Sequence, residues 1–125
     1  MLASSSVVTV MNPDGGEFAV AGIESPGVIT GYDDAINSRG LYFSFDNGAG
    51  SVGPVLPPFM RNTLLGYSTI DELGMVFNSA KPDYAAIMGV CQPDSGIHFE
   101  ISPETYYAVD AGTETSARAN QFVNP

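Results

Sequence analysis

The spacing of apolar residues changes twice along the chain, and this change constrains the fold more than any other feature. Between residues 57 and 80 the apolar side chains recur every three or four positions, which is the period of a helix. On both sides of this stretch, short runs alternate between apolar and polar residues, as half-buried strands do. The sequence therefore predicts two helices, Pro58–Gly66 and Thr69–Ala80, in the middle of a chain of β-strands.

Capping residues set the predicted ends of these helices. Pro57-Pro58 suits a first turn, because proline lacks the amide hydrogen that this turn leaves unbonded. Gly66 is predicted to end the first helix, and Ser68 with Asp71 forms a capping signature for the second. Gly74, inside the second helix, costs ~1 kcal/mol relative to alanine.

The strands are separated by turn-forming residues. Asn12-Pro13-Asp14-Gly15-Gly16 is a strong turn signal and predicts a hairpin over residues 7–23. In one later run, Leu41, Phe43 and Phe45 alternate with polar or small residues, which gives a single apolar face. Further strands are expected over residues 28–36, 41–46, 84–91, 97–102 and 105–110. The predicted fold class is α+β, a single domain over residues 1–125, with antiparallel β-sheets and two helices packed on one face.

Composition narrows the possible partners. The chain has four Lys and Arg residues and fourteen Asp and Glu residues, which gives a net charge of −10. Nucleic acid and anionic membranes are therefore not expected as partners. No apolar stretch is long enough to span a membrane, and the first residues lack the pattern of a secretion signal, so a cytoplasmic location is expected. With one cysteine and one histidine, no internal disulfide, metal site or cofactor is expected.

Three groups of residues are candidates for chemistry. Cys91 could act as a nucleophile with His98 as its base, because the turn at residues 92–96 brings their strands together. The alternative is structural: Cys91 ends an apolar run and is expected to be buried, and His98 lies on the face opposite Ile97. Asp33-Asp34 is either a carboxylate pair or a solvated kink.

Asp46-Asn47-Gly48 follows the run that begins at Leu41 and admits two interpretations. Asn and Gly both tolerate positive φ, so the three residues can form a turn. The side-chain amide of Asn47 could instead polarise a carbonyl group in a binding site.

Several stretches, taken in order, resemble one family. They are "VTVMNPDGGEFAVAGIESPGVITGYDDAINSRGL", "LPPFMRNTLLGYSTIDEL", "YAAIMGVCQPDSGIHFEISPETYYAV" and "RANQF". Together they resemble the choloylglycine hydrolase and penicillin acyltransferase branch of the N-terminal nucleophile hydrolases, which cleave linear amide C–N bonds. The resemblance covers nearly all of this chain but only the middle of such an enzyme. It implies that Asn47 and Asn120 match two asparagines of the family's active site, with Asn47 in the oxyanion hole.

The same resemblance implies part of an αββα sandwich, in which two sheets face each other and helices cover the outer faces. This chain differs from the family because it begins with Met1 in place of the nucleophilic cysteine. The leading hypothesis is therefore a non-catalytic module for binding or assembly. The alternatives are one part of a split amide hydrolase completed by another chain, and a small cysteine enzyme that uses Cys91 and His98.

Too few helices are predicted to cover two sheets, which leads to an expectation about partners. An uncovered sheet face or edge favours self-association, so a homodimer or a complementing chain is expected. A two-fold interface of more than ~1,000 Å², rich in Tyr, Phe and Met, is expected. The resemblance also implies a small amide-like ligand.

Overall fold

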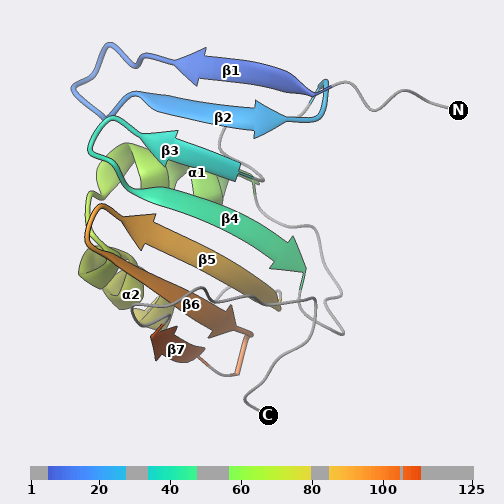
Figure 1. The fold of residues 1–125 in the computed structure, drawn as a ribbon, viewed down its shortest axis with the longest axis vertical. Coiled ribbons are helices and arrows are strands. Elements are labelled where there is room, and N and C mark those ends of the chain that lie inside the picture. The colour runs from blue at the N-terminus through green and yellow to red at the C-terminus, as the bar shows by residue number, and fades with distance from the viewer. Residues whose placement is uncertain (1–5, 28–33, 48–56, 80–84, 105, 111–125) are drawn as a thin grey trace, which may run out of the picture.

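The structure is a computed structural model, and it describes residues 6–27, 34–47, 57–79, 85–104 and 106–110, with the backbone alone for residues 46, 47, 57–60 and 110. Four strands precede two helices and three strands follow them (Figure 1). Their bounds are β1 Val7–Met11, β2 Val20–Glu24, β3 Asp34–Asn37, β4 Tyr42–Asn47, α1 Pro57–Gly66, α2 Ile70–Ser79, β5 Ala86–Gln92, β6 Ser95–Ile101 and β7 Tyr106–Asp110. The predicted helices and the order of elements are confirmed.

The described strands form one antiparallel sheet in the order β1 to β7, so each strand pairs with its neighbours in sequence. This is a difference from the expectation of strands in two facing sheets. The reason lies at β4 and β5: they pair over six residues, from Tyr42 with Cys91 to Asn47 with Ala86, although both helices separate them in sequence. The α+β class with antiparallel strands is confirmed.

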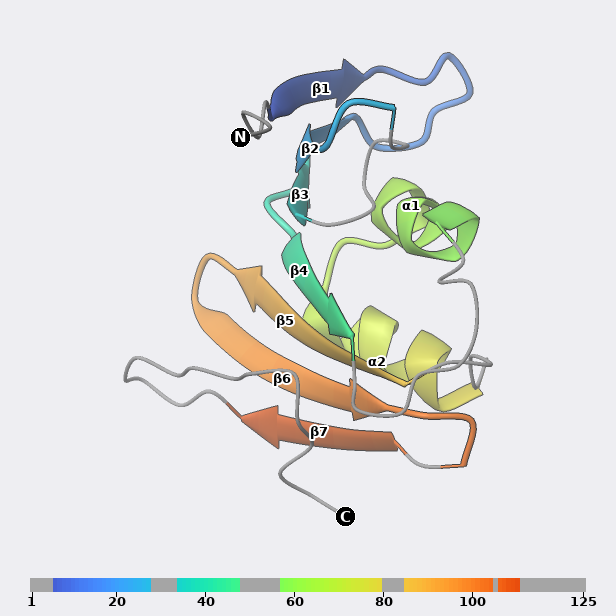
Figure 2. The ribbon, with the colours of Figure 1, turned by 90° about the vertical axis from the view of Figure 1, so that its right-hand side faces the viewer.

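Both helices lie on the same side of the sheet (Figure 2). Helix α1 contacts β3, and α2 contacts β5, β6 and β7. We call this side the helix face and the other side the open face. The prediction that two helices pack on one face is therefore confirmed.

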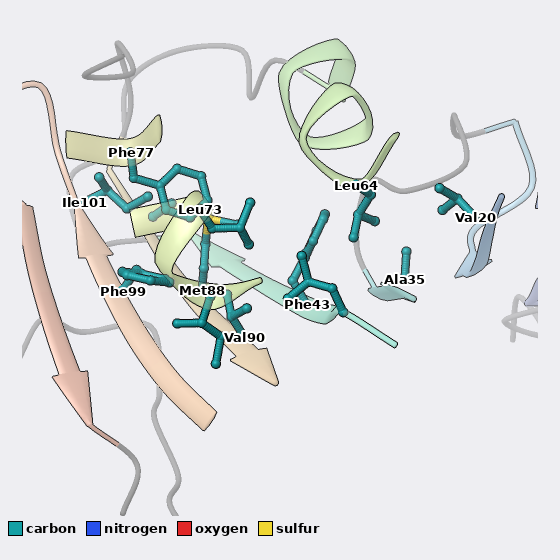
Figure 3. Close-up of a cluster of buried hydrophobic side chains, with 13 residues drawn as sticks. Val20, Ala35, Phe43, Leu64, Leu73, Phe77, Met88, Val90, Phe99 and Ile101 are labelled. Carbon is teal, nitrogen blue, oxygen red and sulfur yellow. The ribbon is translucent and has the colours of Figure 1, made fainter. Parts of the chain in front are cut away.

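Alternation along each strand decides which side chains reach the helix face. Phe43 and Leu41 are fully buried, and Phe45 packs against the core, as the alternating pattern predicted. Helix α2 contributes Leu73 and Phe77 to the same cluster, which Figure 3 shows between the helices and the sheet. The core therefore forms a single layer between one face of the sheet and the two helices.

Helix α2 begins at Ile70, and its capping residue is Thr69, one residue later than the predicted Ser68. The Glu72 carboxylate accepts hydrogen bonds from the backbone N–H groups of Ser68, at 2.8 Å, and Thr69, at 3.0 Å. The Glu72 N–H donates to Thr69 Oγ1 at 3.3 Å, which completes a reciprocal capping box. The hydrogen bond from the Ser68 backbone N–H is the main cause that lowers the pKa of the Glu72 carboxyl group. The predicted pair of Ser68 and Asp71 is therefore wrong, because the side chain that reaches back is one residue further along.

Gly74 has a packing role that offsets its low helix propensity. A Cβ atom at this position would lie 3.0 Å from the Tyr106 hydroxyl and 3.7 Å from the Phe99 ring. A side chain at this position would require the Tyr106 hydroxyl to shift by a few tenths of an ångström. Glycine therefore lets the helix approach the sheet closely.

Asn37 connects the turn between β3 and β4 to helix α1. Its side-chain Nδ2 donates to the carbonyl oxygens of Leu64, at 2.9 Å, and Tyr67, at 2.8 Å. Its Oδ1 accepts from the backbone N–H groups of Arg39, at 3.0 Å, and Leu41, at 3.1 Å. The buried amide thus uses both donors and its acceptor, and it holds the end of α1 against the sheet. None of the described helices is long and apolar enough to cross a membrane.

Candidate functional site

The open face carries exposed apolar side chains over β1, β2 and β3. The register pairs Val8 with Ile23 and Val10 with Ala21, and Ala21 in turn with Ile36. Val8 and Val10 are 75% and 65% exposed, Ile23 is 57% exposed and Ile36 is 44% exposed. We call these four residues the apolar patch. No described helix or strand covers them, and branched aliphatic groups gathered in this way are typical of a contact surface.

A hollow of about 350 Å³ opens beside this patch. It is lined by Val8, Ala21, Gly22, Ile23, Asp34, Ala35, Ile36 and Tyr42. Most of the lining is apolar, and a carboxylate with a phenol forms its polar part. A volume of this size is at the lower end of the range for small-molecule sites.

The polar part of the hollow is one hydrogen-bonded pair. Tyr42 Oη donates to Asp34 Oδ1 at 2.7 Å. Burial, followed by this bond to the carboxylate, raises the pKa of Tyr42 to about 12. The phenol therefore keeps its proton at neutral pH and remains a donor. The Asp34 carboxylate has acceptor sites beyond the one that Tyr42 uses, so it can accept a hydrogen bond from a ligand.

A second polar group lies on the open face over β4, β5 and β6. Ser44, Gly89 and His98 stand in one row, because Gly89 pairs with Ser44 on one side and with His98 on the other. A Cβ atom at Gly89 would lie 2.8 Å from Ser44 Oγ and 3.8 Å from His98 Nδ1. The glycine leaves open the space between these two side chains. His98 is half-buried and lies on the face opposite Ile97, as predicted.

Cys91 lies on the same face as His98, one diagonal step across the hairpin. Cys91 pairs with Gly96 and His98 pairs with Gly89, so each residue opposes a glycine. The expectation that Cys91 is buried is wrong, since its side chain is exposed. The physical reason is that residue 91 falls on the open face near the end of β5, and Gly96 has no side chain to cover it. The prediction of a Cys91–His98 pair stays a prediction.

The two asparagines that the resemblance implied cannot be compared in the described part of the chain. Asn47 is the last residue of β4, where its backbone pairs with Ala86. Its side chain and the whole of Asn120 lie outside the described residues, as does Asp33. The oxyanion interpretation of Asn47 and Asn120 therefore stays a prediction.

Sequence reasoning missed two features of the site. The sequence places Asp34 beside Asp33, whereas its hydrogen-bond partner in the structure is Tyr42 from the next strand. Glu100 is fully buried, although its position opposite Ile87 places it on the open face. The alternation of residues 97–102 could have placed Glu100 on that face, but not its burial. Among the described residues, no three His, Cys, Asp or Glu side chains come close enough to hold a metal ion.

Comparisons with known proteins agree with this fold. A variant of conjugated bile acid hydrolase from Clostridium perfringens has a similar structure, with a TM-score of 0.56 at 16% sequence identity. The similarity covers 76% of this chain and 36% of the hydrolase chain, so this chain spans little more than a third of that protein. A scan of family models and a search of curated proteins found no match. At this identity the similarity shows the fold alone, and it supports the family resemblance at that level.

Proposed function

We propose that the chain is a non-catalytic binding module with an N-terminal-nucleophile-hydrolase-like fold. In this proposal the ligand lies in the hollow beside the apolar patch on the open face. The observation that carries the proposal is the combination of four exposed aliphatic side chains with the hydrogen-bonded pair of Asp34 and Tyr42. Apolar walls with a few convergent polar groups are the usual composition of a ligand site.

The hollow favours a ligand with a short apolar chain and one hydrogen-bond donor. Ile23, Ile36 and Val8 would contact the chain. The Asp34 carboxylate would accept the donor, because Tyr42 occupies only one of its acceptor sites. A secondary amide has such a donor, and the family resemblance also favours an amide-like ligand.

A pair of isosteric compounds tests this proposal. N-methylhexanamide and methyl hexanoate have the same chain, and only the amide has an N–H donor. With about nine heavy atoms at ~0.3 kcal/mol each, we expect the amide to bind with a Kd on the order of 10 mM. In backbone NMR spectra, the amide should shift the signals of Ala21, Ile23 and Ile36. The ester should bind roughly threefold to tenfold more weakly, since it cannot donate to Asp34.

Two variants serve as controls. Asp34→Ala should make the affinities for the amide and the ester equal, whereas Met75→Ala should change neither. Met75 is a matched surface position because it is exposed on α2, on the opposite side of the sheet. Binding that moves no signal of the hollow, or an amide no better than its ester, would contradict the proposed site.

A split amide hydrolase is the second candidate, and one observation supports it. The hydrolase of similar structure is much longer than this chain, and Asn47 stands at a strand end, where a site completed by another chain could lie. The NMR samples separate the catalytic alternatives. The proposal expects no release of methylamine from the amide. Release that is abolished by Cys91→Ser would favour the cysteine enzyme, and release only after a second chain is added would favour the split hydrolase.

A further inference from the structure

Strand β1 is an edge strand without the usual protection against pairing. It is the first strand of the sheet, and no described strand lies beyond it. Its sequence, Val7–Met11, contains no charge and no proline. Edge strands of soluble proteins commonly contain charged residues or proline, which prevent a second strand from adding to the sheet. The polar groups along the outer side of β1 are therefore available to another strand.

The sequence of β1 is complementary to itself in an antiparallel arrangement. A two-fold axis through Thr9 would place Val8 opposite Val10 of the second copy, and Val7 opposite Met11. Pairs of β-branched residues directly opposite each other stabilise antiparallel strands. Val8 and Val10 lie on the open face and are the most exposed members of the apolar patch. Each would cover part of its counterpart in the second copy.

Thr9 supplies an independent observation at the centre of this arrangement. Its side-chain Oγ1 is buried and has no hydrogen-bond partner among the described residues. Thr9 of a second copy would lie directly opposite on the same face of the joined sheet. Cross-strand threonine pairs can hydrogen-bond through their hydroxyl groups, because each is both a donor and an acceptor. Since Oγ1 is covered by its own chain, a rotation about χ1 would turn it toward the second copy.

We infer that β1 pairs with β1 of a second copy of this chain to form a two-fold dimer with one continuous sheet. A two-fold axis perpendicular to the sheet keeps both open faces on the same side. The two apolar patches then adjoin, and the dimer presents two ligand hollows side by side. This interface differs from the expected one, because it is formed mainly by valines of an edge strand and contains Met11 but no Tyr or Phe.

Because the chain is strongly charged, the stability of the dimer should depend on the salt concentration. Each copy has a formal charge of −10, so two copies repel each other at low ionic strength. The paired strand itself carries no charge. We therefore expect added sodium chloride to strengthen the dimer, because salt screens the repulsion without weakening an apolar contact.

A charge-swap experiment tests the register. Light scattering and analytical ultracentrifugation would follow the mass of the chain from micromolar to millimolar concentration. The wild type should form a dimer, whereas the double variants Val8→Lys/Val10→Lys and Val8→Glu/Val10→Glu should each associate at least about tenfold more weakly. Mixing the two variants should restore the dimer, because this register places each lysine opposite a glutamate.

Two single variants distinguish dimerisation through β1 from dimerisation through other surfaces. Met75→Lys adds one positive charge at a similarly exposed position on α2, and it should leave the dimer intact. Ile23→Lys should also leave it intact, since Ile23 belongs to the open face but not to β1. A dimer lost in Ile23→Lys would overturn the inference in favour of face-to-face packing. A wild type that stays monomeric at millimolar concentration would overturn it as well, without affecting the ligand test on the hollow.

Discussion

Replacing Asn37 with leucine should lower the free energy of unfolding by about 3–5 kcal/mol. The leucine removes four hydrogen bonds at once: two to the carbonyl oxygens of Leu64 and Tyr67, and two from the N–H groups of Arg39 and Leu41. Each buried polar group left without a partner costs about 1–3 kcal/mol. The total is a large part of the ~5–15 kcal/mol that stabilises a typical domain. Urea unfolding followed by circular dichroism measures it.

Two further variants make this prediction specific to the Asn37 side chain. Asn62→Leu, at an exposed position of α1, should change the free energy of unfolding by less than about 0.5 kcal/mol. Asn37→Asp keeps an acceptor for Leu41 but turns an oxygen toward the carbonyl groups of Leu64 and Tyr67. It should therefore be destabilising at neutral pH. A loss below about 1 kcal/mol for Asn37→Leu would show that α1 is not held by this residue.

Replacing Phe99 with alanine should have an effect of similar size, about 3–5 kcal/mol. Phe99 is buried, and its ring centroid lies 5.2 Å from that of Phe77 and 5.8 Å from that of Tyr106. These contacts join β6 to both α2 and β7, so the cavity would lie where three elements meet. Differential scanning calorimetry would report the loss as a lower Tm.

Matched substitutions separate packing from a general effect of mutation. Phe99→Leu retains an apolar side chain, so it should cost much less than the alanine variant. Met75→Ala, on the exposed side of α2, should stay within about 0.5 kcal/mol of the wild type. Equal losses for Phe99→Ala and Met75→Ala would contradict the position of the core between α2 and the sheet.

The sequence predicted the elements of this fold better than their assembly. Apolar periodicity is local, so both helices and the alternation of Leu41 and Phe43 could be predicted from neighbouring residues. The pairing of β4 with β5 could not, because it joins residues on either side of two helices. Neither could the role of Asn37, since its partners Leu64 and Tyr67 lie 27 and 30 residues away.

The candidate site was even harder to predict from the sequence, because the register of the strands decides which of its side chains meet. The contact of Tyr42 with Asp34 exists because β3 and β4 pair with Asp34 opposite Ser44, and a shift of one residue would turn one of the two side chains to the other face. The exposure of Cys91 followed from the glycine opposite it, which an apolar run of residues does not reveal. The apolar patch combines three strands, so alternation within β1 alone could not identify it.

One face of this sheet is covered by helices, and the other presents apolar side chains to solvent over β1, β2 and β3. The most direct test is the relaxation of methyl NMR signals by a neutral gadolinium chelate, which broadens the signals of groups that it can approach. The methyl groups of Ile23 and Ile36 should broaden strongly, whereas those of Leu73 and Val90, which are fully buried, should not. If Ile23 and Ile36 were as protected as Leu73, the open face would be covered over β1 to β3, which would contradict the exposure of these strands.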